Sequence, residues 1–177
     1  EKDEVDLSKV KPLILGRLIG GPFGLLLLLN LSEKYLSISV GLIVLIAGAG
    51  SFFGWEINRN TLNSFFAGTF SGIFGMIAAI GGPPVALLYR NTKSQEFRPS
   101  LNSVFSIGIL ITLSLLILSG NLYFDHLLLF MLFLPIVLIG IRVSSSLFSK
   151  VSDSFIAQSV TYFSFISGLY VILRNIN

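Results

Sequence analysis

The sequence predicts an all-helical protein that crosses a membrane several times. Hydrophobic residues make up 53% of its 177 residues and charged residues only 12%, with a mean hydropathy of +0.85. A soluble domain carries about twice that share of charge. The charges are also segregated, and all but the fourth of the charge-free stretches reach the ~20 residues that a membrane-spanning helix needs. The stretches without Asp, Glu, Lys or Arg are 35–55, 60–89, 99–124, 127–141 and 154–173.

We predict six spans joined by short polar segments. A turn at 30–34 separates the first span from the second, and residues 56–63 connect the second to the third. The most polar internal connection is 90–100, in which Pro99 is placed for the first turn of the next helix. Residues 150–153 join the last two spans. The six predicted spans are 12–30, 36–55, 63–89, 100–119, 124–147 and 154–173.

The third predicted span is broken by four residues, Gly81-Gly82-Pro83-Pro84. Glycine loosens the backbone, and proline brings no N–H, so we expect one helix to end here and another to begin near Pro84. Backbone groups freed at membrane depth are tolerated only where they are buried in protein or line a wet cavity. A broken helix of this kind is the best sequence pointer to a transporter's binding site.

The break predicts a site for a small anion. The restarted helix would present free N–H groups and a partial positive charge, and we expect the donors just beyond the prolines, at Val85, Ala86 and Leu87. Glycines let the backbone approach a ligand oxygen, and a nearby serine adds a hydroxyl. The alternative is a kink that only serves helix packing. The candidate residues at the break are Ser71, Gly75, Gly81, Gly82, Pro83, Pro84 and Val85.

Two more residues complete the candidate substrate site. Arg98 is the best charged candidate, because a guanidinium grips an oxyanion with two hydrogen bonds; the alternative is an ordinary arginine of a cytoplasmic loop. Asn102, at the start of the fourth span, is a candidate pore-lining residue. We expect Arg17 and Arg142 to snorkel to the lipid headgroups.

Small and aromatic residues predict how the spans pack and where they end. Gly68 and Gly72 form a small-xxx-small pair that Gly75 continues, so a neighbouring backbone can approach this face closely. Aromatic residues near the ends of the spans predict an interfacial belt. These are Trp55, Tyr35, Tyr89, Tyr123 and Tyr170.

An internal repeat is visible at an offset of 120 residues. Residues 18–48 then match 138–168 at nine positions without gaps, including Leu18-Ile19-Gly20 on Leu138-Ile139-Gly140 and Gly48 on Gly168. We therefore expect residues 1–58 to be the latter part of a first repeat and 59–177 to be the second. By symmetry, two further helices would precede the first span in an eight-helix protein. Four helices per copy would make the two copies parallel.

The chain resembles the TauE/SafE (sulfite exporter, TSUP) family of membrane transporters. The resemblance rests on Gly68-x3-Gly72-x2-Gly75 leading into the Gly-Gly-Pro-Pro break, and on a polar loop that ends in Phe97-Arg98-Pro99. Supporting features are Val5-Asp6 before a glycine-rich first span, and Gly140 and Arg142 before a last helix that carries Gly168. The resemblance implies an eight-helix transporter of small anions, with sulfite, sulfonates and related organic acids as substrates.

Other classes of protein fit the sequence less well. A membrane-embedded protease needs a serine with a histidine, or a pair of aspartates, within the membrane. His126 lies at the very start of the fifth predicted span, before its charge-free part 127–141, and no span holds a pair of aspartates, so we do not expect an enzyme. We expect no cofactor and no metal: the chain has no cysteine, and His126 is its one histidine. Lys and Arg form no basic stripe, which argues against nucleic acid.

We therefore predict a multi-pass secondary transporter in the cell (cytoplasmic) membrane that interacts with the lipid bilayer and a small anionic substrate. Two alternatives stay open: a carrier of a neutral metabolite, and a structural or regulatory membrane subunit that transports nothing. Homo-oligomerisation is left open as well.

Overall fold

The chain folds into helices only, which confirms the predicted fold class. A computed structural model describes residues 7–55, 57–89, 94–148 and 153–176. Within these ranges there are seven helices and no strand. The helices are α1 (Leu7–Asn30), α2 (Glu33–Phe52), α3 (Thr61–Ala78), α4 (Gly82–Leu88), α5 (Ser94–Leu118), α6 (Phe124–Phe148) and α7 (Asp153–Ile176).

Five helices in the described residues are long and apolar enough to cross a membrane, namely α1, α2, α3, α5 and α6. The prediction of a polytopic helical membrane protein is therefore confirmed. The predicted sixth span, 154–173, is helical as α7. The predicted third span, 63–89, is two helices, α3 and α4, and its break lies at residues 79–81.

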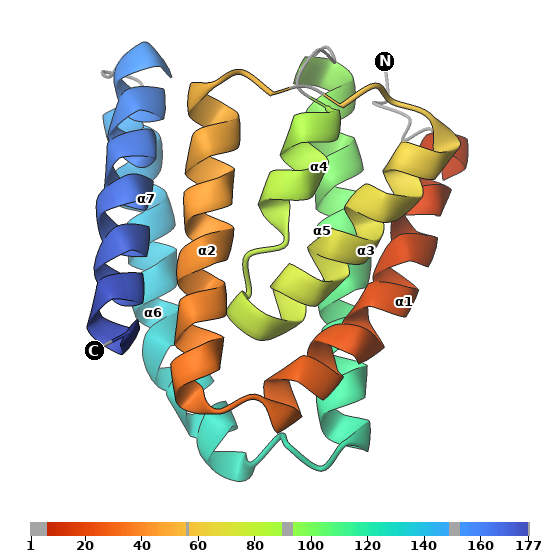
Figure 1. The fold of residues 1–177 in the computed structure, drawn as a ribbon, viewed down its shortest axis with the longest axis vertical. Coiled ribbons are helices and arrows are strands. Elements are labelled where there is room, and N and C mark those ends of the chain that lie inside the picture. Colours follow the sequence, from red (N-terminus) through yellow and green to blue (C-terminus); the bar gives the residue numbers. More distant parts are fainter. Residues whose placement is uncertain (1–6, 56, 90–93, 149–152, 177) are drawn as a thin grey trace.

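The α3–α4 pair is a helical hairpin and not one broken span. Ala79 takes a left-handed conformation with φ of 56°, which ends α3 and reverses the chain direction. Figure 1 shows that α4 then returns toward the end of the bundle at which α3 began. The second helix starts at Gly82, two residues earlier than expected, because Pro83 and Pro84 fit a first helical turn, where N–H groups have no partner anyway.

The hairpin changes the predicted symmetry. Because it enters and leaves at one end of the bundle, it adds no crossing. As a result, α1 and α6, which the 120-residue offset pairs, run in opposite directions, and so do α2 and α7 (Figure 1). The parallel relation expected from four crossings per copy is therefore wrong. The paired helices have the inverted orientation found in many secondary transporters.

Glycines bring the backbones of α1 and α3 together. These two helices share the most extensive helix–helix interface of the described chain. A Cβ on Gly20 would overlap the carbonyl oxygen of Thr69, and a Cβ on Gly68 would overlap the carbonyl oxygen of Leu13. The close approach predicted from the small residues of α3 is confirmed. Packing of this kind replaces the hydrophobic driving force that lipid cannot supply.

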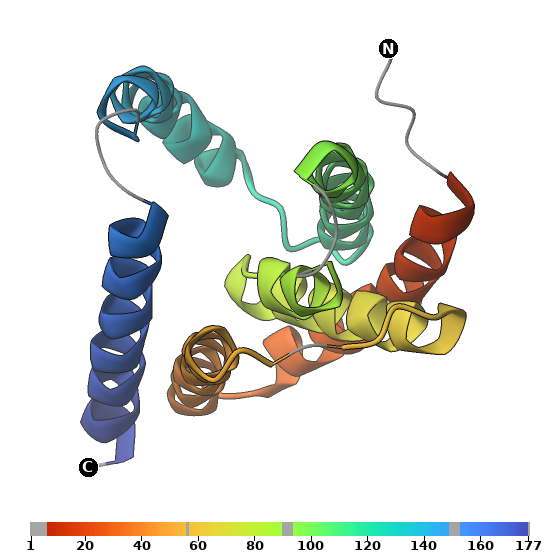
Figure 2. The ribbon, with the colours of Figure 1, turned by 90° about the horizontal axis from the view of Figure 1, so that it is seen from above.

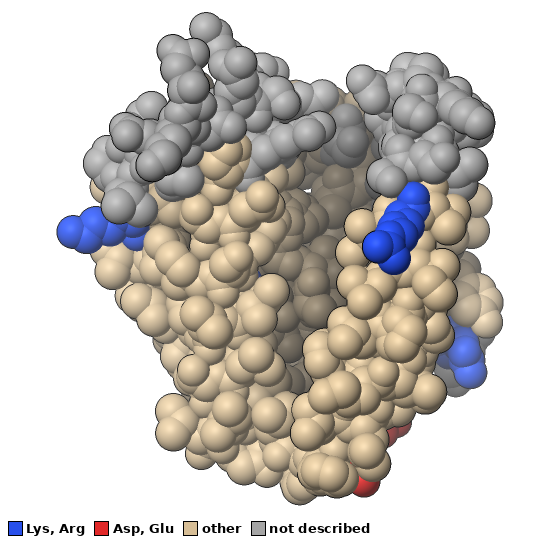
Figure 3. All heavy atoms as spheres, turned by 180° about the vertical axis from the view of Figure 1, so that it is seen from behind, with Lys and Arg blue, Asp and Glu red and all other residues tan. Residues whose placement is uncertain are grey.

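The other side of the molecule is more open. α2 packs on α7, but no residue of Phe124–Val143 in α6 is buried in the described structure. Seen from above, α6 stands apart from α5 (Figure 2). The space-filling view from behind shows a hollow on this face of the molecule (Figure 3).

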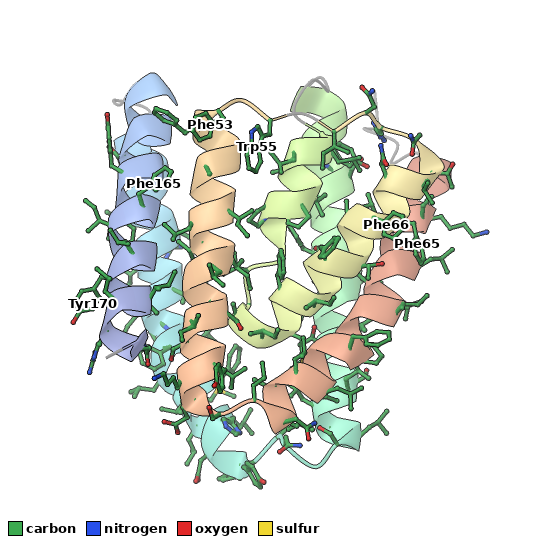
Figure 4. All side chains as sticks on the ribbon, in the orientation of Figure 1. Phe53, Trp55, Phe65, Phe66, Phe165 and Tyr170 are labelled. Carbon is green, nitrogen blue, oxygen red and sulfur yellow. The ribbon has the colours of Figure 1, made fainter. Side chains whose placement is uncertain are left out.

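Aromatic side chains mark the ends of several helices. Phe53 and Trp55 stack with ring centroids 6.3 Å apart just after α2, and Tyr170 lies on the outer side of α7 (Figure 4). These positions fit an interfacial belt. Tyr89 does not, because only 1% of its surface is exposed; its hydroxyl accepts a hydrogen bond of 3.2 Å from Arg59, whose guanidinium covers the ring.

Basic residues are concentrated at the end where the hairpin enters, which we call the hairpin end. It contains the first residues of α1, α3, α5 and α7 and the last residues of α2, α4 and α6 (Figure 1). Lys9 and Lys11 belong to the start of α1, Arg59 directly precedes α3 and Arg98 belongs to the start of α5, whereas Lys34 and Arg174 belong to the opposite end. By sequence, the connections between α4 and α5 and between α6 and α7 add Arg90, Lys93 and Lys150.

The positive-inside rule predicts that the hairpin end faces the cytoplasm. The chain has no cysteine, so single cysteines can report this directly. We expect Ser32→Cys, at the opposite end, to react with a membrane-impermeant maleimide in intact cells, and Asn58→Cys, at the hairpin end, to react only after permeabilisation. Ser32 makes no capping hydrogen bond that the substitution would remove. The reverse labelling pattern would place the hairpin end outside.

Two adjacent glycines provide a test of the α1–α3 interface. Gly20→Ala should destabilise the protein by about 1–3 kcal/mol, because its Cβ meets backbone that cannot move aside. Gly21→Ala should have a smaller effect, because its Cβ meets side chains and no backbone: the flexible end of Leu115 at 2.9 Å and Cγ2 of Ile111 at 3.4 Å. Thermal unfolding of the detergent-purified protein measures both. Equal melting temperatures for the two variants would contradict backbone contact at Gly20.

Candidate functional site

The backbone of the break is held by hydrogen bonds inside the protein. The hydroxyl of Ser71, which is fully buried in α3, donates to the carbonyl oxygen of Gly81 at 2.5 Å. The N–H of Ala79 donates to the carbonyl oxygen of Gly75 at 3.1 Å. These bonds stabilise non-helical backbone where lipid provides no partner. The predicted hydroxyl of Ser71 is therefore at the break, and in this structure it supports the backbone.

Arg17 of α1 lies beside the break, inside the bundle. Only 5% of its surface is exposed, and its Nη1 atom has no hydrogen-bond partner among the described residues. The expectation that Arg17 snorkels to the headgroups is wrong. The reason is its position: the glycine packing of α1 on α3 points it at the protein interior, which leaves its side chain no path to the membrane surface.

Small residues and one aromatic ring surround the guanidinium of Arg17. A Cβ on Gly75 would lie 3.1 Å from Nη2, and one on Gly81 would lie 3.4 Å from the same atom. A Cβ on Gly108 of α5 would overlap the guanidinium itself. The ring of Phe105 faces the guanidinium carbon at 5.6 Å from the ring centroid, within the range of a cation–π interaction.

The helices next to Arg17 carry one carboxylate by sequence, Glu96 in the first turn of α5, twelve positions before Gly108. By sequence, 7–32, 57–95 and 97–124 contain neither Asp nor Glu. These ranges cover α1, α3, α4 and nearly all of α5, the helices that contact the guanidinium or lie next to it. The positive charge is thus surrounded by apolar side chains and backbone.

A cavity of about 600 Å³ lies against the break and Arg17. Its volume is within the range of ligand sites in proteins, about 300–1,000 Å³, and its mostly apolar lining with few polar groups is also typical of them. Arg17 is the charged residue and Thr112 the hydroxyl residue among the lining residues that the structure describes. The residues that line the cavity are Arg17, Gly75, Ala79, Ile80, Gly81, Gly82, Pro83, Phe105, Ile109, Thr112 and Leu113.

The structure brings some of the predicted site residues together and separates others. Gly75, Gly81, Gly82 and Pro83 line the cavity, and Ser71 touches the break from behind. Pro84 lines a second, apolar cavity of about 370 Å³ on the α2 side of the hairpin.

Two of the remaining candidates, Val85 and Asn102, do not line the cavity. Val85 is fully buried in the cluster of apolar residues that includes Val10 and Leu13. Asn102 is exposed. The side chain of Arg98 lies outside the described residues.

The start of α4 offers fewer N–H donors than the sequence suggested. Since the helix begins at Gly82, Val85 and the residues after it donate to the carbonyl group four residues earlier. The two prolines occupy positions where free N–H groups would otherwise be. Gly81 and Gly82, which precede the prolines, are therefore the residues of this turn that have an N–H group to offer.

Arg17 is the residue that the sequence analysis assigned incorrectly. One signal was available: it is the charged residue inside the predicted span 12–30, six positions from the preceding charge at Lys11. An ionisable residue within a membrane span is by default a candidate functional residue. Its neighbours, however, come from α3 and α5, and a single sequence does not pair these helices.

The sequence was compared with known proteins. A family model described as "Sulfite exporter TauE/SafE" matches residues 1–171. No curated protein and no solved structure matches.

Proposed function

Because the chain belongs to the sulfite exporter TauE/SafE family of membrane transporters, we propose that it is a secondary transporter that moves a small anion across the cytoplasmic membrane. The anions proposed are sulfite, a sulfonate or a related organic acid. The resemblance found in the sequence and the multi-pass helical fold are the premises of this proposal.

One observation supports an anion above other substrates: the cavity at the helix break is bordered by a buried, positively charged side chain. The break lies within the bundle, and the one acidic residue that the surrounding helices α1, α3, α4 and α5 carry by sequence is Glu96, in the first turn of α5, so the local potential is positive. A cation would be repelled from such a cavity, and a neutral metabolite would leave the charge uncompensated. An anion is the substrate that this potential attracts.

The α3–α4 hairpin contains the segment whose displacement we propose for transport. α4 is a short helix of seven residues joined to α3 through Ala79, Ile80 and Gly81. Its tip meets the cavity, and its outer end lies at the hairpin end of the bundle (Figure 1). We propose that displacement of the hairpin tip opens the site to one side of the membrane, with Gly81, Gly82 and Pro83 in contact with the substrate. Arg98, near the start of α5, would attract anions from the aqueous side.

A flux measurement tests this function. The full-length protein is reconstituted into liposomes, and uptake of labelled sulfite and ethanesulfonate is followed with time and concentration. We expect saturable uptake that empty liposomes do not show. Absence of saturable uptake across a panel of sulfur oxyanions and carboxylates would contradict transport of small anions.

Substitution at Gly82 tests the location of the site. A Cβ at Gly82 would lie 3.8 Å from the Phe105 ring, which is ordinary contact, so the backbone tolerates a side chain while the rest of a leucine enters the cavity. We expect Gly82→Leu to lower uptake about tenfold or more, because overfilling a site costs about 1–3 kcal/mol. Ala86→Leu is the matched control, since Ala86 is an exposed residue of the same helix. Equal uptake by both variants would make the break a packing feature only.

A further inference from the structure

The guanidinium of Arg17 is buried without a complete set of partners. It is 95% buried, given its 5% exposure, and Nη1 has no hydrogen-bond partner among the residues that the structure describes. An ionised group that is removed from water and left unpaired is strongly destabilising. Within a membrane span the penalty is larger still. A stable protein therefore needs something else to compensate this charge.

The surroundings position the guanidinium and leave room beside it. Gly75, Gly81 and Gly108 leave space that any larger residue would take from Arg17. The Phe105 ring lies to one side, with its centroid 5.6 Å from the guanidinium carbon. On the cavity side no described acidic group approaches. The result is a preorganised donor group that borders a space large enough for a ligand.

We propose that Arg17 is the anion-binding residue of this protein. Its guanidinium holds a singly charged oxyanion, such as hydrogensulfite, an alkanesulfonate or a carboxylate, through paired N–H···O hydrogen bonds. The proposal rests on the transport function proposed above and names the group that binds the substrate. The bound anion supplies the counter-charge that α1, α3, α4 and α5 lack around Arg17.

The rest of the cavity defines the class of substrate further. One cationic side chain matches one negative charge, so a monoanion leaves no excess charge in the site. Ile80, Ile109 and Leu113 form an apolar wall, and Thr112 adds one hydroxyl. A short hydrocarbon group on the anion would lie against this wall, whereas a neutral sulfone of the same shape lacks the charge that Arg17 pairs with.

The test compares Arg17→Gln with Lys11→Gln. Both variants remove one positive charge from α1, but Lys11 is exposed. In reconstituted liposomes, we expect Arg17→Gln to lower ethanesulfonate uptake about tenfold to a hundredfold, the equivalent of one lost charge-assisted hydrogen-bonded contact. Lys11→Gln should retain wild-type uptake.

Thermal unfolding provides a readout that does not depend on transport. Sulfite or ethanesulfonate should raise the melting temperature of the purified wild type and of Lys11→Gln, because a ligand that binds only the folded state stabilises it. Neither anion should shift Arg17→Gln. Dimethyl sulfone, the neutral probe, should shift none of the three. Without anion, Arg17→Gln should melt at or above the wild-type temperature, since the unpaired charge is gone, and this also shows that the variant folds.

Two further variants separate charge from geometry. Arg17→Lys keeps the charge but loses the planar fork, so we expect a raised KM with residual uptake. Gly108→Ala should displace the guanidinium and raise the KM as well, because its methyl group occupies the same space. Leu110→Phe, on the exposed side of α5, is the matched control for added bulk and should leave the KM unchanged.

The outcomes distinguish this proposal from the proposed function. If Arg17→Gln keeps the uptake of the wild type and is still stabilised by anions, the role of Arg17 is overturned and anion transport stands. Anion-dependent stabilisation that depends on Arg17, without uptake, would support the site and overturn transport. Equal stabilisation by dimethyl sulfone would overturn recognition of charge. If no oxyanion produces either stabilisation or uptake with the wild type, both proposals are overturned.

Discussion

The close packing of α1 on α3 is the constraint from which the other features follow. Glycines on both helices let their backbones approach until a single Cβ at Gly20 or Gly68 would overlap the partner's carbonyl oxygen. In lipid, such contact replaces hydrophobic burial as the source of helix association. It also fixes the rotation of α1 about its axis, and that rotation decides that Arg17 points into the protein. Small residues in this interface thus determine both the packing and the position of the charge.

The α3–α4 hairpin follows from the local chemistry of the residues at the break. A left-handed Ala79 ends α3, the Ser71 hydroxyl donates to the carbonyl oxygen of Gly81, and two prolines in the first turn of α4 bring no N–H group that would need a partner. Each of these features answers the requirement that backbone polar groups in a membrane have partners. Because the chain reverses at the break, the tip of the hairpin stays within the bundle. The non-helical residues 79–81 are therefore located next to the cavity and the guanidinium.

The energetics of the site are opposed to those of the fold. Glycine packing and apolar contacts stabilise the bundle, while an unpaired guanidinium among apolar residues destabilises it. Arg17 contacts Phe105 and is enclosed by glycines, but these neighbours carry no negative charge. Proteins commonly accept such a local penalty at functional sites, where a ligand relieves it.

The sequence alone determined the class of the fold, the approximate limits of the helices, the break and the family, because these depend on composition, on proline and glycine chemistry and on local spacing. The charge-free stretches predicted the spans, and Gly81 to Pro84 predicted the interruption of the third. Only the tertiary structure decided that the interrupted helix is a hairpin, that the paired helices run in opposite directions, and that Arg17 is buried. Whether a chain reverses at a break depends on the backbone angles of Ala79, and the environment of Arg17 depends on residues about 60 and 90 positions away in Gly75 and Gly108. Local sequence patterns do not identify such distant neighbours, so only the packing of the helices determines the direction of the Arg17 side chain.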